Sequence, residues 1–140
     1  MTMKPLPKSD QALVLRTDFS NDSAWAQVCA AIRRPVDGFL AYVEFVDDPA
    51  FRDITTDQVV ELGRDIPMSY IIVADRDTIA LPDHTLLIVD LAEEPGRTFR
   101  AIPSQIQSIE NNLSIANLDF REFAEAAGTD GVYRGYPPTS

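Results

Sequence analysis

The sequence has few of the residues that most often build catalytic and metal centres. It contains one cysteine, Cys29, and one histidine, His84. A disulfide within the chain needs two cysteines, and a Cys/His zinc cluster needs more ligands of these types, so both are excluded. Cys29 falls on the apolar stripe of a predicted helix, which indicates a buried, unreactive thiol. His84 stands in a predicted loop without a serine or cysteine nucleophile motif, so we expect it at the surface.

Glycine is also sparse, and long apolar runs are missing. The six glycines form neither a phosphate loop nor a dinucleotide-binding fingerprint, so no motif supports nucleotide binding. No apolar run approaches the roughly 18 residues of a membrane helix, and residues 1–10 lack the apolar segment of a signal peptide. We expect a flexible N-terminal arm over residues 1–10, a single domain over residues 11–136 and a C-terminal tail over residues 137–140, in a soluble cytoplasmic protein.

Basic side chains are outnumbered by acidic ones. The 12 lysines and arginines face 22 aspartates and glutamates, which gives a formal net charge of −10. This charge repels phosphate backbones and anionic lipids, so neither a nucleic acid nor a membrane is an expected partner. A basic protein is the electrostatic complement, although the same acidity can also serve solubility alone. With 140 residues, 45% of them hydrophobic, the chain is long enough to bury the core of one domain.

Runs of apolar and β-branched residues alternate with helical patterns along the chain. The helices are expected over residues 23–34, after Thr55 or Thr56 with Gln58 completing a capping box, after Ser104, and after Asp119. Strands are expected over residues 12–16, 39–46, 69–74, 85–92 and 98–102. Helical crossovers join parallel strands, so the first strands should be parallel and the later ones antiparallel. The pattern predicts an α/β fold: one domain with a mixed sheet of about five strands packed by four helices.

Aspartates follow the predicted ends of the first three strands. If these strands are parallel, all four side chains lie at the sheet edge where open α/β sheets bind ligands: Asp18, Asp47, Asp48 and Asp75. Two or three such carboxylates on neighbouring loops could hold Mg²⁺. The alternative is that these aspartates cap helices and start turns, which is where Asp most often occurs.

A second group of polar residues gathers near a turn and a helix junction. The turn after the fourth predicted strand carries two carboxylates, and three asparagines crowd the junction between the last two helices. The candidate binding surface consists of Glu93, Glu94, Asn111, Asn112, Asn117 and Asp119. These residues could recognise a partner or fix the angle between the helices. They could also simply satisfy backbone groups at helix ends. Asp90, inside a predicted strand, must find a hydrogen-bond partner.

Four stretches of the sequence carry a resemblance to known proteins. They read RTDF, YVEFVDDP, EEPGRTFR and NNLSIANLDF, at residues 16–19, 42–49, 93–100 and 111–120. Over residues 13–136 the chain resembles a family of small uncharacterised actinobacterial proteins that form a domain of unknown function. The resemblance implies a bacterial, cytoplasmic protein, and it implies no activity, cofactor or catalytic residue.

Three classes of function remain open. The leading hypothesis is a non-enzymatic protein-binding domain, for example an immunity-type or regulatory partner of a basic protein, because a small acidic chain without a catalytic set suits fast association with a basic surface. The second is a metal-assisted hydrolase or phosphoryl-transfer enzyme that uses Asp18 with Asp47 or Asp48. The third is a self-associating structural protein whose fifth strand or C-terminal helices form a homodimer.

Overall fold

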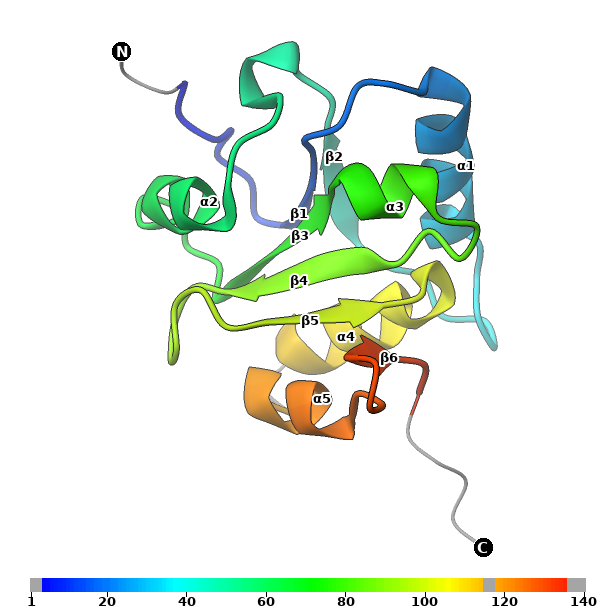
Figure 1. The fold of residues 1–140 in the computed structure, drawn as a ribbon. Coiled ribbons are helices and arrows are strands. Elements are labelled where there is room, and N and C mark those ends of the chain that lie inside the picture. Colours follow the sequence, from blue (N-terminus) through cyan, green and yellow to red (C-terminus); the bar gives the residue numbers. More distant parts are fainter. Residues whose placement is uncertain (1–3, 115–117, 136–140) are drawn as a thin grey trace, which may run out of the picture.

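The computed structural model describes residues 4–114 and 118–135, which form one mixed sheet covered by helices on both faces (Figure 1). The strand order is β2-β1-β3-β4-β5-β6. The strands are β1 (Ala12–Arg16), β2 (Val43–Val46), β3 (Tyr70–Ala74), β4 (Leu86–Asp90), β5 (Thr98–Ala101) and β6 (Val132–Tyr133). Strand β1 pairs in parallel with β2 and β3, whereas β4 runs antiparallel to both β3 and β5. The predicted α/β class and the change from parallel to antiparallel pairing are therefore confirmed.

Helices join the strands, and several of them begin at a residue whose side chain caps the N-terminus. They are α1 (Asp22–Arg33), α2 (Thr56–Gly63), α3 (Arg76–Ala80), α4 (Ile106–Ser114) and α5 (Phe120–Ala126), with short 3₁₀ turns η1 (Pro49–Phe51) and η2 (Pro103–Gln105). Thr55 and Gln58 form the predicted capping box of α2, and Asp119 caps α5 through the N–H of Glu122. None of the helices in the described ranges is long and apolar enough to cross a membrane.

The central strands divide the apolar core into two layers. Ile72 and its neighbours on one face pack against α1, α4 and α5, whereas Ile71 on the other face packs against Val59 of α2. Successive side chains of a strand point to opposite faces, so β3 needs apolar residues at every position. The continuous runs predicted to be central strands are indeed buried in the middle of the sheet. Leu6, within the expected N-terminal arm, is buried in the second layer.

Three local predictions were wrong, and one strand was missed. Residues 77–83 were expected to form a loop, but Asp75 and Thr78 build a capping box that starts α3. Ser104 caps no helix, because it lies within η2. The strand expected at residues 39–46 is only β2, because β1 starts at Ala12, opposite Val43, and offers no partner further back. A sixth strand, β6, was missed, because its two residues are too few to show a pattern.

Candidate functional site

The carboxyl ends of the first three strands meet at one edge of the sheet, as predicted. Each candidate carboxylate at this edge, however, is held by its own neighbours. Arg16, at the end of β1, is almost fully buried, and its guanidinium bonds the Asp47 carboxylate at 3.1 Å and the Asp22 carboxylate at 2.7 Å. The same guanidinium stacks on Phe19, 4.4 Å from the ring centroid. Arg16 therefore ties the end of β1 to the residue that follows β2 and to the start of α1.

The other three carboxylates act as turn or helix caps. Asp18 accepts the backbone N–H of Ser20 at 2.9 Å. Asp48 caps η1 and pairs with Lys4. Asp75 caps α3, and both of its oxygens accept hydrogen bonds from Arg100 of β5. Burial alone would raise the pKa of Asp75, but the hydrogen bonds from Arg100 and Thr78 outweigh it and hold the pKa below its ordinary value.

This arrangement bears on the predicted Mg²⁺ site. Among the described residues, no three Asp, Glu, His or Cys side chains converge as metal ligands. Arg16 and Arg100 were missed as partners of these carboxylates. Arg16 is the last residue of its strand, and aspartates follow the ends of the strands on both sides of it. This pattern in the sequence could have predicted that Arg16 pairs with one of them. The Mg²⁺ site itself stays a prediction, and the geometry favours caps and ion pairs for these aspartates.

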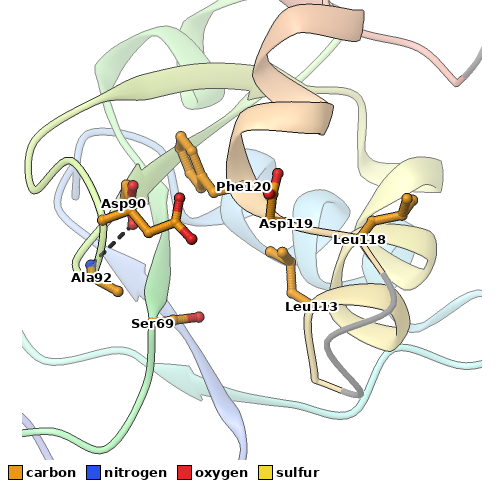
Figure 2. A pocket seen from close by; sticks show the side chains of 8 residues that line it. Ser69, Asp90, Ala92, Leu113, Leu118, Asp119 and Phe120 are labelled. Atoms are coloured by element: carbon orange, nitrogen blue, oxygen red, sulfur yellow. Dashed lines mark hydrogen bonds between the residues drawn. The ribbon is translucent and has the colours of Figure 1, made fainter.

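A hollow of about 180 Å³ lies at the opposite end of the strands, where β3 begins and β4 ends (Figure 2). We call it the acidic hollow. It lies where the turn after β4 faces the junction between α4 and α5, so the antiparallel direction of β4 brings these distant segments together. Figure 2 shows Asp90 and Ala92 on one side, Asp119, Leu113 and Leu118 on the other, and Phe120 between them. The lining residues are Ser69, Asp90, Ala92, Glu93, Leu113, Leu118, Asp119 and Phe120.

Asp90 organises the turn on one side of the acidic hollow. It is 3% exposed, and its two oxygens accept the backbone N–H groups of Ala92 at 3.0 Å and Glu94 at 2.9 Å. Its backbone also exchanges hydrogen bonds with Gly96 and Arg97 across the turn. Asp90 thus finds the partners that the sequence demanded, and it fixes the turn that carries the two exposed glutamates.

The carboxylates that rim the acidic hollow differ in how they are paired. Glu94 bonds Arg97 at 2.9 Å. Asp119 uses one oxygen to cap α5. Glu93 is exposed, and none of the described side chains pairs with it. Of the described residues that line the hollow, none is basic, and Leu113, Leu118 and Phe120 supply an apolar surface. The hollow therefore offers free negative charge beside apolar side chains.

The asparagines of the predicted surface do not all reach this hollow. Asn111 donates to the carbonyl oxygens of Leu40 and Gln107, and Asn112 donates to that of Ser108, so both bond backbone. Asn117 lies outside the described residues. Of the six predicted binding residues, the structure brings Glu93 and Asp119 together in the acidic hollow. Asn111 instead joins α4 to the segment before β2.

Two further residues bear on catalysis. Cys29 is buried, and burial raises the pKa of its thiol to about 11, which leaves it protonated at neutral pH. His84 is half-buried, and its Nδ1 lies 2.7 Å from the carbonyl oxygen of Thr78. Glu110, in contrast, was missed: this buried carboxylate accepts the backbone N–H of Tyr42 and the hydroxyl of Ser114. Its place beside asparagines in a helix gave no separate signal.

Comparison with known proteins gives a family but no activity. No curated protein matches the chain. A family model described as a domain of unknown function (DUF6924) matches residues 11–136, which is most of the chain. The chain therefore belongs to this family of domains of unknown function.

Proposed function

We propose that the chain is a non-enzymatic protein-binding domain and that the acidic hollow receives a lysine or arginine side chain of a basic partner. The observation that carries the proposal is that two exposed carboxylate residues, Glu93 and Asp119, line one hollow. The apolar residues Leu113, Leu118 and Phe120 line the same hollow. Lysine and arginine have an apolar stem and a charged head, so they match a site with both features.

The size of the hollow supports a single side chain as the ligand. Sites for drug-sized molecules typically enclose about 300–1,000 Å³, whereas the acidic hollow encloses about 180 Å³. A hollow of this size can anchor one residue at the centre of a larger protein interface.

The charge of the whole chain adds to the local one. Glu93 and Asp119 are exposed, and an exposed ion pair contributes only about 0–1 kcal/mol. The net charge of −10 acts mainly on the association rate, which we expect to fall steeply as salt rises. An immunity-type or regulatory protein that must capture a basic partner quickly fits these properties.

A titration followed by NMR tests the hollow directly. The probe is the tripeptide amide Gly-Arg-Gly, and Gly-Gln-Gly serves as the uncharged control. We expect the arginine peptide to shift the backbone amide signals of Ala92, Glu93, Leu118 and Phe120, with saturation in the millimolar range. The glutamine peptide should leave these signals in place. Shifts spread evenly over the acidic surface would contradict a specific site.

Two double variants with the same charge change separate the site from the overall field. Glu93→Gln with Asp119→Asn neutralises the hollow, and asparagine still caps a helix. Asp53→Asn with Asp57→Asn neutralises two exposed carboxylates near the opposite edge, where the Asp53 N–H bonds the Thr17 carbonyl. The first variant should lose the response to the arginine peptide, and the second should keep it. An equal loss of the response to the arginine peptide in both variants would contradict the proposal.

A further inference from the structure

The open edge of β2 and the segment before it form an exposed apolar strip. Strand β2 stands at one end of the sheet, so its outer side has no neighbouring strand in the described structure (Figure 1). We call residues 39–42 the overhang, because they precede Val43, whose partner Ala12 is the first residue of β1. Phe39, Leu40 and Tyr42 are 59%, 41% and 59% exposed. An exposed strand edge flanked by large apolar side chains is a template for pairing with another chain.

Helix α4 holds the overhang, which extends past the point where β1 begins. The buried Glu110 carboxylate accepts the Tyr42 backbone N–H at 2.7 Å, and Asn111 donates to the Leu40 carbonyl at 3.0 Å. These two side chains supply hydrogen bonds that a neighbouring strand would otherwise supply. Asn111, one of the asparagines of the predicted binding surface, therefore helps to fix the position of the exposed overhang.

The hydrogen bonds that Leu40 and Tyr42 form with α4 indicate which backbone groups of the overhang face outward. Along an extended chain, alternate residues direct their N–H and C=O groups to opposite sides. Because Leu40 and Tyr42 both bond toward α4, the groups of Ala41 and Val43 are directed to the open side. The side chains follow the same alternation, since Ala41, Val43 and Phe45 pack against one core layer. Phe39 exchanges both of its backbone hydrogen bonds with Val36, so within the overhang the outward groups left open are those of Ala41.

Local charge indicates which partner this edge can accept. Residues 33–46 contain two arginines, Arg33 and Arg34, and two acidic residues, Asp37 and Glu44, so this segment is neutral within a chain of net charge −10. A basic partner is drawn to acidic surface instead, while two acidic copies can approach each other best at a neutral surface. We propose that the chain forms a homodimer in which β2 and the overhang pair antiparallel with the same segment of a second copy.

The pairing register follows from the outward groups and from charge. A two-fold axis places identical surfaces together. Centring the pair on Val43 sets Tyr42 of one copy opposite Glu44 of the other, and Leu40 opposite Val46. Centring it on Glu44 instead would set two carboxylates against each other, which is destabilising. The Val43-centred register uses the free groups of Ala41 and Val43 and joins the two sheets into one.

The exposed area implies a weak dimer. A buried aromatic side chain covers about 150–250 Å², so the exposed parts of Phe39, Leu40 and Tyr42 supply roughly 300 Å² in each copy. A standard interface needs about 800 Å² per partner. Backbone pairing and flanking side chains must supply the rest, and we expect a dissociation constant on the order of 10–100 µM.

The homodimer predicted from the sequence used the fifth strand or the C-terminal helices. Strand β5 has β4 on one side, and β6 pairs with Arg100 and Ala101 on the other, so less of its backbone is open than that of β2. The dimer proposed here uses the other end of the sheet. It is separate from the acidic hollow, and either proposal can fail without the other.

Analytical ultracentrifugation between about 5 and 500 µM tests self-association. We expect the wild-type chain to pass from monomer to dimer over this range. The variant Leu40→Ser with Tyr42→Ser should stay monomeric. Leu81→Ser removes another exposed apolar side chain, 48% exposed beyond the end of α3, and it should dimerise like the wild type. A wild-type chain that stays monomeric at 500 µM overturns the proposal, as does equal loss in both variants.

Cross-linking tests the register. In the Val43-centred dimer the two Val43 residues form a hydrogen-bonded pair with their Cα atoms about 5.5 Å apart, within the reach of a disulfide. The variant Val43→Cys should form a covalent dimer under mild oxidation, whereas the wild type should not, because Cys29 is buried. Circular dichroism of each variant verifies that it is folded. A folded dimer of this variant in which the introduced thiols stay reduced would overturn the register.

Discussion

Asp90→Asn is the sharpest test of how the acidic hollow is built. The Asp90 carboxylate is 3% exposed, and each of its oxygens accepts one backbone N–H, from Ala92 and from Glu94. An amide of the same shape has one oxygen and one NH₂ group. Whichever way it turns, one backbone N–H loses its acceptor and faces another donor.

The expected cost follows from those two bonds. A hydrogen bond to a charged group contributes about 1.5–3 kcal/mol, and a buried donor left without a partner costs about 1–3 kcal/mol. Removing a buried charge offsets part of this loss, because the carboxylate no longer needs desolvation. We expect Asp90→Asn to lower the free energy of unfolding by about 2 kcal/mol.

Urea denaturation measures this change. With a slope of about 1–3 kcal/mol per M, a loss of about 2 kcal/mol lowers the midpoint by roughly 1 M. Asp119→Asn is the matched control, because Asp119 also lines the hollow but caps α5 with one oxygen, and asparagine caps equally well. The control should lose less than about 0.5 kcal/mol. If Asp90→Asn costs no more than the control, Asp90 does not hold the turn.

Three further predictions test other parts of the fold. The pKa of Asp75 is lowered in the folded state, so its contribution to stability is present above its unfolded pKa and is lost as pH falls through its folded pKa; Asp75→Asn should flatten acid denaturation curves, and a wild-type slope would contradict this. Thr55→Ala removes the capping box with Gln58 and should cost about 1 kcal/mol in urea denaturation, whereas Thr55→Ser should cost only a few tenths. Burial raises the pKa of the Cys29 thiol to about 11, so the thiol stays protonated at pH 8 and a thiol reagent should label the native protein far more slowly than the unfolded one; equal rates would refute burial.

The sequence by itself determined the local elements where an apolar run marked a buried strand or where a capping box led into a helical apolar pattern. Apolar runs of four or five residues became β1, β3 and β4, because strands buried on both faces are built mainly from apolar residues. Thr55 with Gln58 marked the start of α2, since a capping box is a contact between neighbours in the chain. Short elements escaped, as β6 did, because two residues show no period.

For the candidate site, the sequence supplied the residue types but not their neighbours. It placed Asp18, Asp47 and Asp75 at one edge, and the parallel pairing confirmed that placement. Only the tertiary structure showed that Arg16 pairs with Asp47 and that Arg100 pairs with Asp75, because each arginine reaches a loop distant in sequence. Charge counts cannot tell a free carboxylate from a paired one.

The tertiary structure also decided which surfaces remain free. Glu93 and Asp119 are 26 positions apart in the sequence, and they share the acidic hollow because β4 reverses direction beside β3. The overhang lies open because β1 begins at Ala12 and leaves residues 39–42 without a neighbouring strand. Both outcomes depend on strand order and register, which are set by packing between distant segments and not by the local preferences that a sequence pattern records.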